Sequence, residues 1–153
     1  MSMDYYYFGK EWAYKNIKRL VFVEEILYNE KGEIPSDFKL YMFNGELGAI
    51  NIHLDRFEDN HDNISIDKDF KPFTGEEIPD YIDIETIKPK MFDEMTEYAK
   101  KLADDFDFIR VDFYDLGKDI VLGELTNYPA AGFKRLNKEL DNYLGEIWTL
   151  PNV

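Results

Sequence analysis

An Asn-Gly dipeptide at positions 44 and 45 separates two apolar stretches, and this arrangement limits the folds open to the chain. Residues 38–43 precede the dipeptide, and residues 47–54 follow it. Asn and Gly both accept the positive φ angles of a type I′ turn, whose twist matches that of two paired strands. We therefore predict an antiparallel hairpin here, which a purely helical fold cannot contain. By alternation, His53 lies on the polar face of the return strand, where we expect a structural rather than a ligand role.

Residues 89–105 carry the clearest helical pattern in the chain. Their apolar and aromatic side chains recur at three- and four-residue steps and form one stripe. The stripe consists of Met91, Phe92, Met95, Tyr98, Ala99, Leu102 and Ala103. Acidic residues come early in this segment, and Lys100 and Lys101 come late, as the helix dipole favours. We predict a long helix whose apolar stripe belongs to the core.

A second hairpin is predicted after this helix, with residues 108–114 as its first strand and residues 119–125 as its second. Shorter β-type runs occupy residues 20–23 and 64–66, and a short helix is expected near residues 137–144. Strands, then a helix, then a hairpin indicate the α+β class with a largely antiparallel sheet. We expect the long helix to pack on one face of that sheet, in a single domain spanning the whole chain.

The charge of the chain excludes several classes of function. It contains 18 Lys and Arg against 32 Asp and Glu, for a formal charge of −14, and it contains no Cys. A basic nucleic-acid-binding surface and a polybasic membrane anchor both need the opposite sign. The absence of Cys excludes disulfides, thiolate zinc sites and a Cys nucleophile. No apolar run approaches the roughly 18 residues of a membrane-spanning helix, so we expect a cytoplasmic protein without membrane insertion.

The second predicted hairpin carries the residues most suited to chemistry: Arg110, Asp112 and Glu124. Two carboxylates reach one metal ion only if they share a face of the sheet. A three-residue loop at 116–118 would place Glu124 across from Arg110 and diagonal to Asp112, on one face. A two- or four-residue loop without a bulge would place Glu124 on the opposite face. Gly117 permits the three-residue loop without requiring it.

Paired carboxylates suit Mg²⁺, which usually keeps several waters and takes phosphate oxygens as further ligands. Arg110 beside them fits the same site, because a guanidinium grips the phosphates that such a metal bridges. The alternative is an ordinary cross-strand charge cluster on a solvated face, since charged residues are mostly exposed. Spacing alone leaves both interpretations open.

Several segments together resemble the TupA-like ATP-grasp family, which is associated with teichuronopeptide and surface-polysaccharide biosynthesis. The strongest are FIRVDFY at residues 108–114 and GELTNYPAAGF at residues 123–133. Further similar segments are EWAYKNIK at 11–18, EEIL at 24–27, DFKLYMFNG at 37–45, LDRF at 54–57 with His61, KPKM at 88–91, LGE at 144–146 and LP at 150–151. The resemblance therefore runs through nearly the whole chain.

The resemblance implies roles for residues of this site, with Mg²⁺ as cofactor and ATP as the nucleotide. Asp112 and Glu124 match the two acidic metal ligands, and Thr126 stands where many ATP-grasp proteins carry an Asn ligand. Arg110 matches a residue expected to stabilise the transferring phosphoryl group. The segment that contacts adenine and ribose is matched by Glu24, Glu25 and Leu27.

Two further features of the sequence qualify that assignment. Ala130 and Ala131 depart from the Gly-containing pattern of the family, and Gly gives more room for a substrate. Arg56 and His61 lie in a polar segment, where they would bind phosphate or an anionic acceptor or else form loop salt bridges.

The resemblance also implies that the chain corresponds to the second lobe of a two-lobed site. We expect the first lobe, with its phosphate-binding lysines, to come from a second polypeptide, or the chain to form a homo-oligomer. Three functions stay open: part of an ATP- and Mg²⁺-dependent carboxylate–amine ligase, a non-catalytic remnant or protein-binding module, and, last, a glycosyltransferase-type role in polysaccharide biosynthesis.

Overall fold

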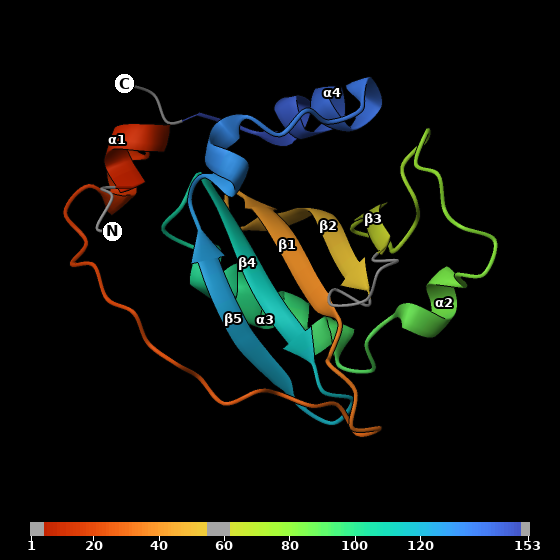
Figure 1. The fold of residues 1–153 in the computed structure, drawn as a ribbon. Helices are drawn as coiled ribbons and strands as arrows, with labels where there is room; N and C mark the ends of the chain where they lie inside the picture. Colours follow the sequence, from red (N-terminus) through yellow and green to blue (C-terminus); the bar gives the residue numbers. More distant parts are fainter. Residues whose placement is uncertain (1–4, 55–61, 151–153) are drawn as a thin grey trace.

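A five-stranded antiparallel sheet forms the centre of the computed structural model, which describes residues 5–54 and 62–150 (Figure 1). The strand order is β3-β2-β1-β4-β5. The strands are β1 (Asp37–Phe43), β2 (Glu46–Leu54), β3 (Asp62–Asp67), β4 (Phe108–Asp115) and β5 (Ile120–Thr126). The α+β class with an antiparallel sheet is thereby confirmed.

The predicted first hairpin is present as β1 and β2. Asn44 and Gly45 connect the strands with φ angles of 50° and 80°, so both occupy the left-handed region that this turn requires. Ile50 and Ile52 are fully buried on one face of β2. On the other face, the His53 imidazole Nε2 and the Asn51 side-chain oxygen lie 2.8 Å apart, which agrees with a hydrogen-bonded histidine.

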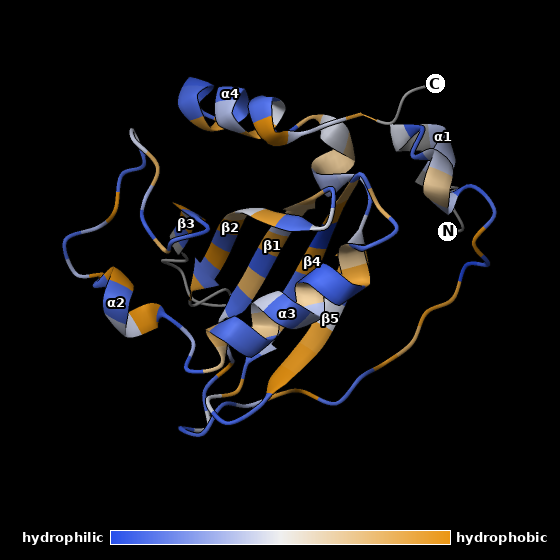
Figure 2. Ribbon diagram, turned by 180° about the vertical axis from the view of Figure 1, so that it is seen from behind, coloured by the Kyte–Doolittle hydropathy of each residue, from blue (hydrophilic) through white to orange (hydrophobic). Residues whose placement is uncertain are grey.

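Helix α3 (Phe92–Ala103) confirms the predicted long helix and covers one face of the sheet, as Figure 2 shows from behind. Its inward residues Met95, Ala99 and Ala103 are fully buried, whereas Tyr98 of the predicted core stripe is 51% exposed, so that part of the prediction is wrong. They join the main core with side chains from one face of the strands, which are Phe38, Leu40, Met42, Ile50, Ile52, Ile64, Ile66, Ile109, Val111 and Phe113. This apolar face leaves the opposite face of the sheet for polar side chains.

Helix α4 (Lys138–Ile147) lies on that opposite face and covers only one end of it. Leu140 and Leu144 pack there against Phe43 and Ala49 in a second, smaller core. The helix begins where predicted, because the side chain of Asn137 accepts a 2.8 Å hydrogen bond from the backbone N–H of Leu140. The rest of the polar face is therefore free to carry a site.

The N-terminal segment passes along the β5 side of the sheet (Figure 1). It contains the short helix α1 (Tyr5–Gly9) and the single turn η1 (Trp12–Tyr14), and residues 17–29 contain no regular element. The predicted strand at residues 20–23 is wrong, because no described strand pairs with it and its apolar side chains face solvent, with Val21 99% exposed.

Two short elements complete the fold: α2 (Ile84–Ile87) and the turn η2 (Pro129–Gly132) after β5. Within the described ranges, no helix combines the length and apolar character needed to cross a bilayer.

Candidate functional site

The pairing of β4 with β5 decides which residues meet on the polar face. Asp115 pairs with Ile120, so residues 116–119 form a four-residue loop, which is the alternative to the three-residue loop that Gly117 also permits. The register then shifts, because Asp112 pairs with Glu124 whereas Phe113 pairs with Leu122, leaving Gly123 as the extra residue of a β-bulge. A four-residue loop alone would place Glu124 on the opposite face of the sheet. The extra residue of the bulge reverses this and puts Glu124 on the same face as Asp112.

Glu124 consequently lies directly opposite Asp112, and Thr126 lies opposite Arg110. The diagonal arrangement of Asp112 and Glu124 expected from the shorter loop is thus replaced by a direct cross-strand pair. The Arg110 Nη2 atom is 3.5 Å from a carboxylate oxygen of Glu124. The structure therefore brings together four of the residues predicted for the site: Arg110, Asp112, Glu124 and Thr126.

The buried carboxylate of Asp112 is held by two cations. Arg110 donates two hydrogen bonds to it, from Nε at 2.6 Å and from Nη2 at 2.7 Å. Lys39 on β1 donates a third at 2.7 Å, and its ammonium also reaches Asp37 at 2.6 Å. Burial opposes the charge of Arg110, but the hydrogen bonds and charge of Asp112 outweigh it and raise the pKa of the guanidinium.

Thr126 links the buried and exposed parts of this cluster. Its hydroxyl accepts a 2.9 Å hydrogen bond from Arg110 Nη2 and donates a 2.6 Å hydrogen bond to Glu124. The side chain of Glu124 is 59% exposed, whereas that of Asp112 is 4% exposed. Glu124 is therefore the carboxylate that a ligand reaches first.

The oxygen atoms on this face suit a metal ion that is bound together with a phosphorylated ligand. They suit less well a metal ion that protein side chains alone would coordinate. Among the described residues, no group of three or more Asp, Glu or His side chains gathers closely enough to hold a metal. Mg²⁺ needs only one or two carboxylates when phosphates and waters complete its shell. Glu124 satisfies that requirement as it stands, whereas Asp112 would first exchange its contacts to Arg110 and Lys39.

A cleft of about 450 Å³ lies beside the first half of β5. Glu24, Glu25 and Leu27, the residues to which the family resemblance assigns adenine and ribose contacts, line it from the N-terminal segment. Tyr114, Leu122 and Gly123 are among the residues that form the other side. Such a cleft, with apolar walls and a few polar groups, is a common form of small-molecule site.

A larger cavity of about 630 Å³ lies beside the second half of β5, and sequence reasoning missed most of its residues. Arg110, Glu124 and Thr126 line it together with residues of the N-terminal segment and of η2. The newly identified lining residues include Glu11, Tyr14, Lys15, Lys18, Arg19 and Tyr128. Most of them lie in the segments EWAYKNIK and GELTNYPAAGF that carry the family resemblance, but nothing in the sequence shows that these segments meet, because they do so only when the N-terminal segment folds beside β5.

A further cation, Lys134, follows η2 and lies near the cluster. Burial chiefly, and the charges of Arg110 and Lys39 to a smaller extent, lower its pKa, while Glu76 opposes the shift. The two remaining predicted residues, Arg56 and His61, lie outside the described residues.

Comparison with known proteins identifies the family of the chain. The chain matches the family model described as TupA-like ATPgrasp over residues 1–149. No curated protein and no solved structure matches the chain. The matched span includes β4, β5 and the N-terminal segment, which together contain the described site residues. The chain therefore belongs to the TupA-like ATP-grasp family.

Proposed function

We propose that the polar face of this sheet is the metal- and phosphate-binding half of an ATP-dependent carboxylate–amine ligase site. One observation carries the proposal: Asp112 and Glu124 face each other across β4 and β5, with Arg110 beside both. Two acids and a guanidinium in this arrangement suit a magnesium–nucleotide. The family's association with surface polysaccharides suggests an acceptor from that biosynthesis.

Each group on this face has a task that its position supports. Glu124 and Asp112 would hold Mg²⁺, which when bound neutralises charge on the phosphate oxygens. Thr126 would orient Glu124 through its 2.6 Å hydrogen bond. Arg110 would stabilise the transferred phosphoryl group, and the cleft lined by Glu24, Glu25 and Leu27 would receive the adenosine. Amide formation would follow when an amine displaces phosphate from the activated carboxylate, with loss of a proton.

The family resemblance suggests that a first lobe completes this site, from a second polypeptide or from another copy of the chain. We therefore propose that catalysis needs this partner, while Glu124 and the adjoining cleft already give the chain weak affinity for a nucleotide.

Calorimetric titration with Mg²⁺-ADP tests the proposal. We expect Glu124→Gln to weaken binding at least tenfold, because the substitution removes the accessible carboxylate while keeping its size. Glu97→Gln, on the exposed side of α3, is the matched control and should bind like the parent. Equal affinity of the Glu124 and Glu97 variants, or no binding by the chain with or without a candidate first lobe, would refute the proposal.

A non-catalytic protein-binding module is the second candidate, and the contacts of Asp112 favour it. Both oxygens of this carboxylate are already engaged by Arg110 and Lys39, which is typical of a structural ion pair. If Mg²⁺-ADP fails to bind, this candidate takes precedence.

A further inference from the structure

We infer that the 630 Å³ cavity binds an amine substrate that also carries a negatively charged group, with Glu11 taking the ammonium and Lys15 and Lys18 taking the anion. The inference rests on the proposed function, since it names the class of acceptor for that site. The contributing residues come from the N-terminal segment, to which the sequence assigned no substrate role.

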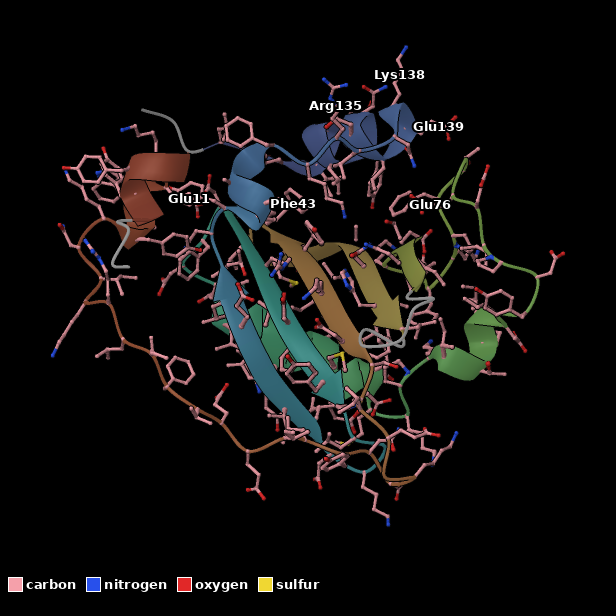
Figure 3. All side chains as sticks on the ribbon, viewed as in Figure 1. Glu11, Phe43, Glu76, Arg135, Lys138 and Glu139 are labelled. Carbon is pink, nitrogen blue, oxygen red and sulfur yellow. The ribbon has the colours of Figure 1, made fainter. Side chains whose placement is uncertain are left out.

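Glu11 is a buried residue that lines the cavity, and its carboxylate has no cation of its own among the described residues. Only 5% of the residue is exposed. Among the residues that the structure describes, none donates a hydrogen bond to its carboxylate or forms an ion pair with it. Figure 3 shows Glu11 between α1 and the η2 turn. A buried charge is costly unless it is paired, so an ammonium group from a ligand in the cavity would supply the missing partner.

The chain makes room for this carboxylate at Gly9. A Cβ atom on Gly9 would lie 2.6 Å from a carboxylate oxygen of Glu11 and 3.2 Å from the Cβ of Ala131. Any larger residue at position 9 would therefore displace Glu11. The position of Glu11 thus depends on an adjacent glycine.

Two lysines supply the opposite charge in the same cavity. Lys15 and Lys18 both line it, and neither forms an ion pair with a residue of the described ranges. Acids outnumber bases in this chain by 32 to 18, so lysines without a carboxylate partner are unexpected here. Lys15 also lies over the ring of Tyr6, with its ammonium 5.3 Å from the ring centroid. A ligand with an ammonium and an anionic group would complement all three side chains.

The place of the cavity along β5 assigns it to the acceptor rather than to the nucleotide. The adenosine cleft borders Val121, Leu122 and Gly123, whereas the cavity borders Glu124 and Thr126 on the same strand. In phosphoryl transfer, the attacking and leaving oxygens lie on opposite sides of the phosphorus. A phosphate held at Glu124 and Arg110 would therefore have its nucleotide on one side and the molecules that react with it on the other.

Two tyrosines add an aromatic wall that suits an ammonium. The rings of Tyr14 and Tyr128 meet edge to face with centroids 6.0 Å apart, and both line the cavity. The backbone N–H of Asn127 donates a 3.1 Å hydrogen bond to the Tyr14 hydroxyl, which ties the N-terminal segment to the end of β5. Aromatic faces attract cations, so these rings suit a cavity that takes an ammonium group.

NMR titrations of the full chain, without nucleotide or Mg²⁺, test the inference. The probes are L-aspartate, N-acetyl-L-aspartate, which lacks the ammonium, and aspartic diamide, which lacks the carboxylates. O-Phosphoethanolamine replaces the carboxylates with phosphate and distinguishes the two anion types. We expect L-aspartate or O-phosphoethanolamine to bind at least tenfold more tightly than the probes that lack one charge, and to shift the amide signals of Glu11 and Tyr14.

The variants separate the two halves of the site. Glu11→Gln should abolish the preference for L-aspartate over N-acetyl-L-aspartate, and Gly9→Ala should do the same by displacing the carboxylate. The double variant Lys15→Gln/Lys18→Gln should weaken L-aspartate binding at least tenfold but leave binding of the diamide unchanged. The control Lys31→Gln/Lys101→Gln makes the same change in net charge and should have no effect.

Absence of binding by every probe, no discrimination between L-aspartate and its N-acetyl derivative, or equal effects of the two double lysine variants would overturn the inference. Its failure is distinguishable from failure of the proposed function. The probes are titrated without metal or nucleotide, so the parent chain can discriminate among them whether or not it binds Mg²⁺-ADP, and each measurement can fail while the other succeeds.

Discussion

Ala130 and Ala131 have backbone φ angles of 49° and 53°, in the left-handed region that favours Gly. Side chains with a Cβ atom are strained there by roughly 1–2 kcal/mol per residue. We expect Ala131→Gly to raise the free energy of unfolding by about 0.5–1 kcal/mol, because the strain relieved exceeds the added entropy of the unfolded chain. Urea denaturation monitored by circular dichroism measures the change. Ala131→Val should act in the opposite direction, and a stabilising valine would contradict the explanation.

Lys39 holds two buried carboxylates, those of Asp37 and Asp112. Removing one member of a buried ion pair commonly costs 3–5 kcal/mol, because the remaining charge loses its partner. Arg110 still contacts Asp112, so we expect Lys39→Met to lower the free energy of unfolding by about 3 kcal/mol. Urea denaturation at neutral pH tests this, with the exposed Lys31→Met as a control. A loss similar to that of the control would show that Lys39 is dispensable for stability.

At the scale of elements, the β-bulge at Gly123 positions the site. A Cβ atom on Gly123 would lie 2.8 Å from the ring of Tyr114 on the neighbouring strand. Inserting atoms into a packed contact costs roughly 1–3 kcal/mol. We therefore expect Gly123→Val to destabilise the chain by that amount and to weaken Mg²⁺-ADP binding through displacement of Glu124.

A double-mutant cycle isolates this contact. In the Tyr114→Ala background, the valine has room, so its destabilising effect should shrink by at least half. Thermal and urea denaturation of the four proteins give the coupling energy. If Gly123→Val destabilises the Tyr114→Ala protein as much as the parent, the destabilisation arises from the backbone of the bulge and not from contact with the Tyr114 ring.

At the scale of the whole molecule, the net charge of −14 acts against the compact state through self-repulsion. Raising the ionic strength from about 0.01 M to 0.15 M shortens the Debye length from roughly 30 to 8 Å. We expect the Tm to rise by about 2–4 °C, which corresponds to roughly 1 kcal/mol for a domain of this size. Differential scanning calorimetry in a buffer with a chelator excludes divalent cations. A falling Tm would show that attractive surface pairs outweigh the repulsion.

The sequence by itself determined the elements whose causes are local. Asn44 and Gly45 accept the turn angles of the first hairpin, and the apolar stripe of residues 89–105 predicts a helix that packs against a core, as most of the stripe does. The spacing of apolar residues and the residue types of a turn involve only neighbours in the sequence, so both features can be recognised from the sequence. The residue types at Arg110, Asp112 and Glu124 suited metal and phosphate chemistry, but the same residues also suited an ordinary charge cluster on the sheet.

Only the tertiary structure decided how these residues meet. A loop of four residues and a bulge at Gly123 together place Glu124 opposite Asp112, and neither loop length nor bulge is encoded by alternation. Lys39 donates a hydrogen bond to Asp112 from a strand that lies more than seventy positions earlier in the chain. Glu11 becomes a buried carboxylate only because the N-terminal segment folds against the turn after β5. These outcomes depend on contacts between distant segments, and a periodic pattern carries no information about such contacts.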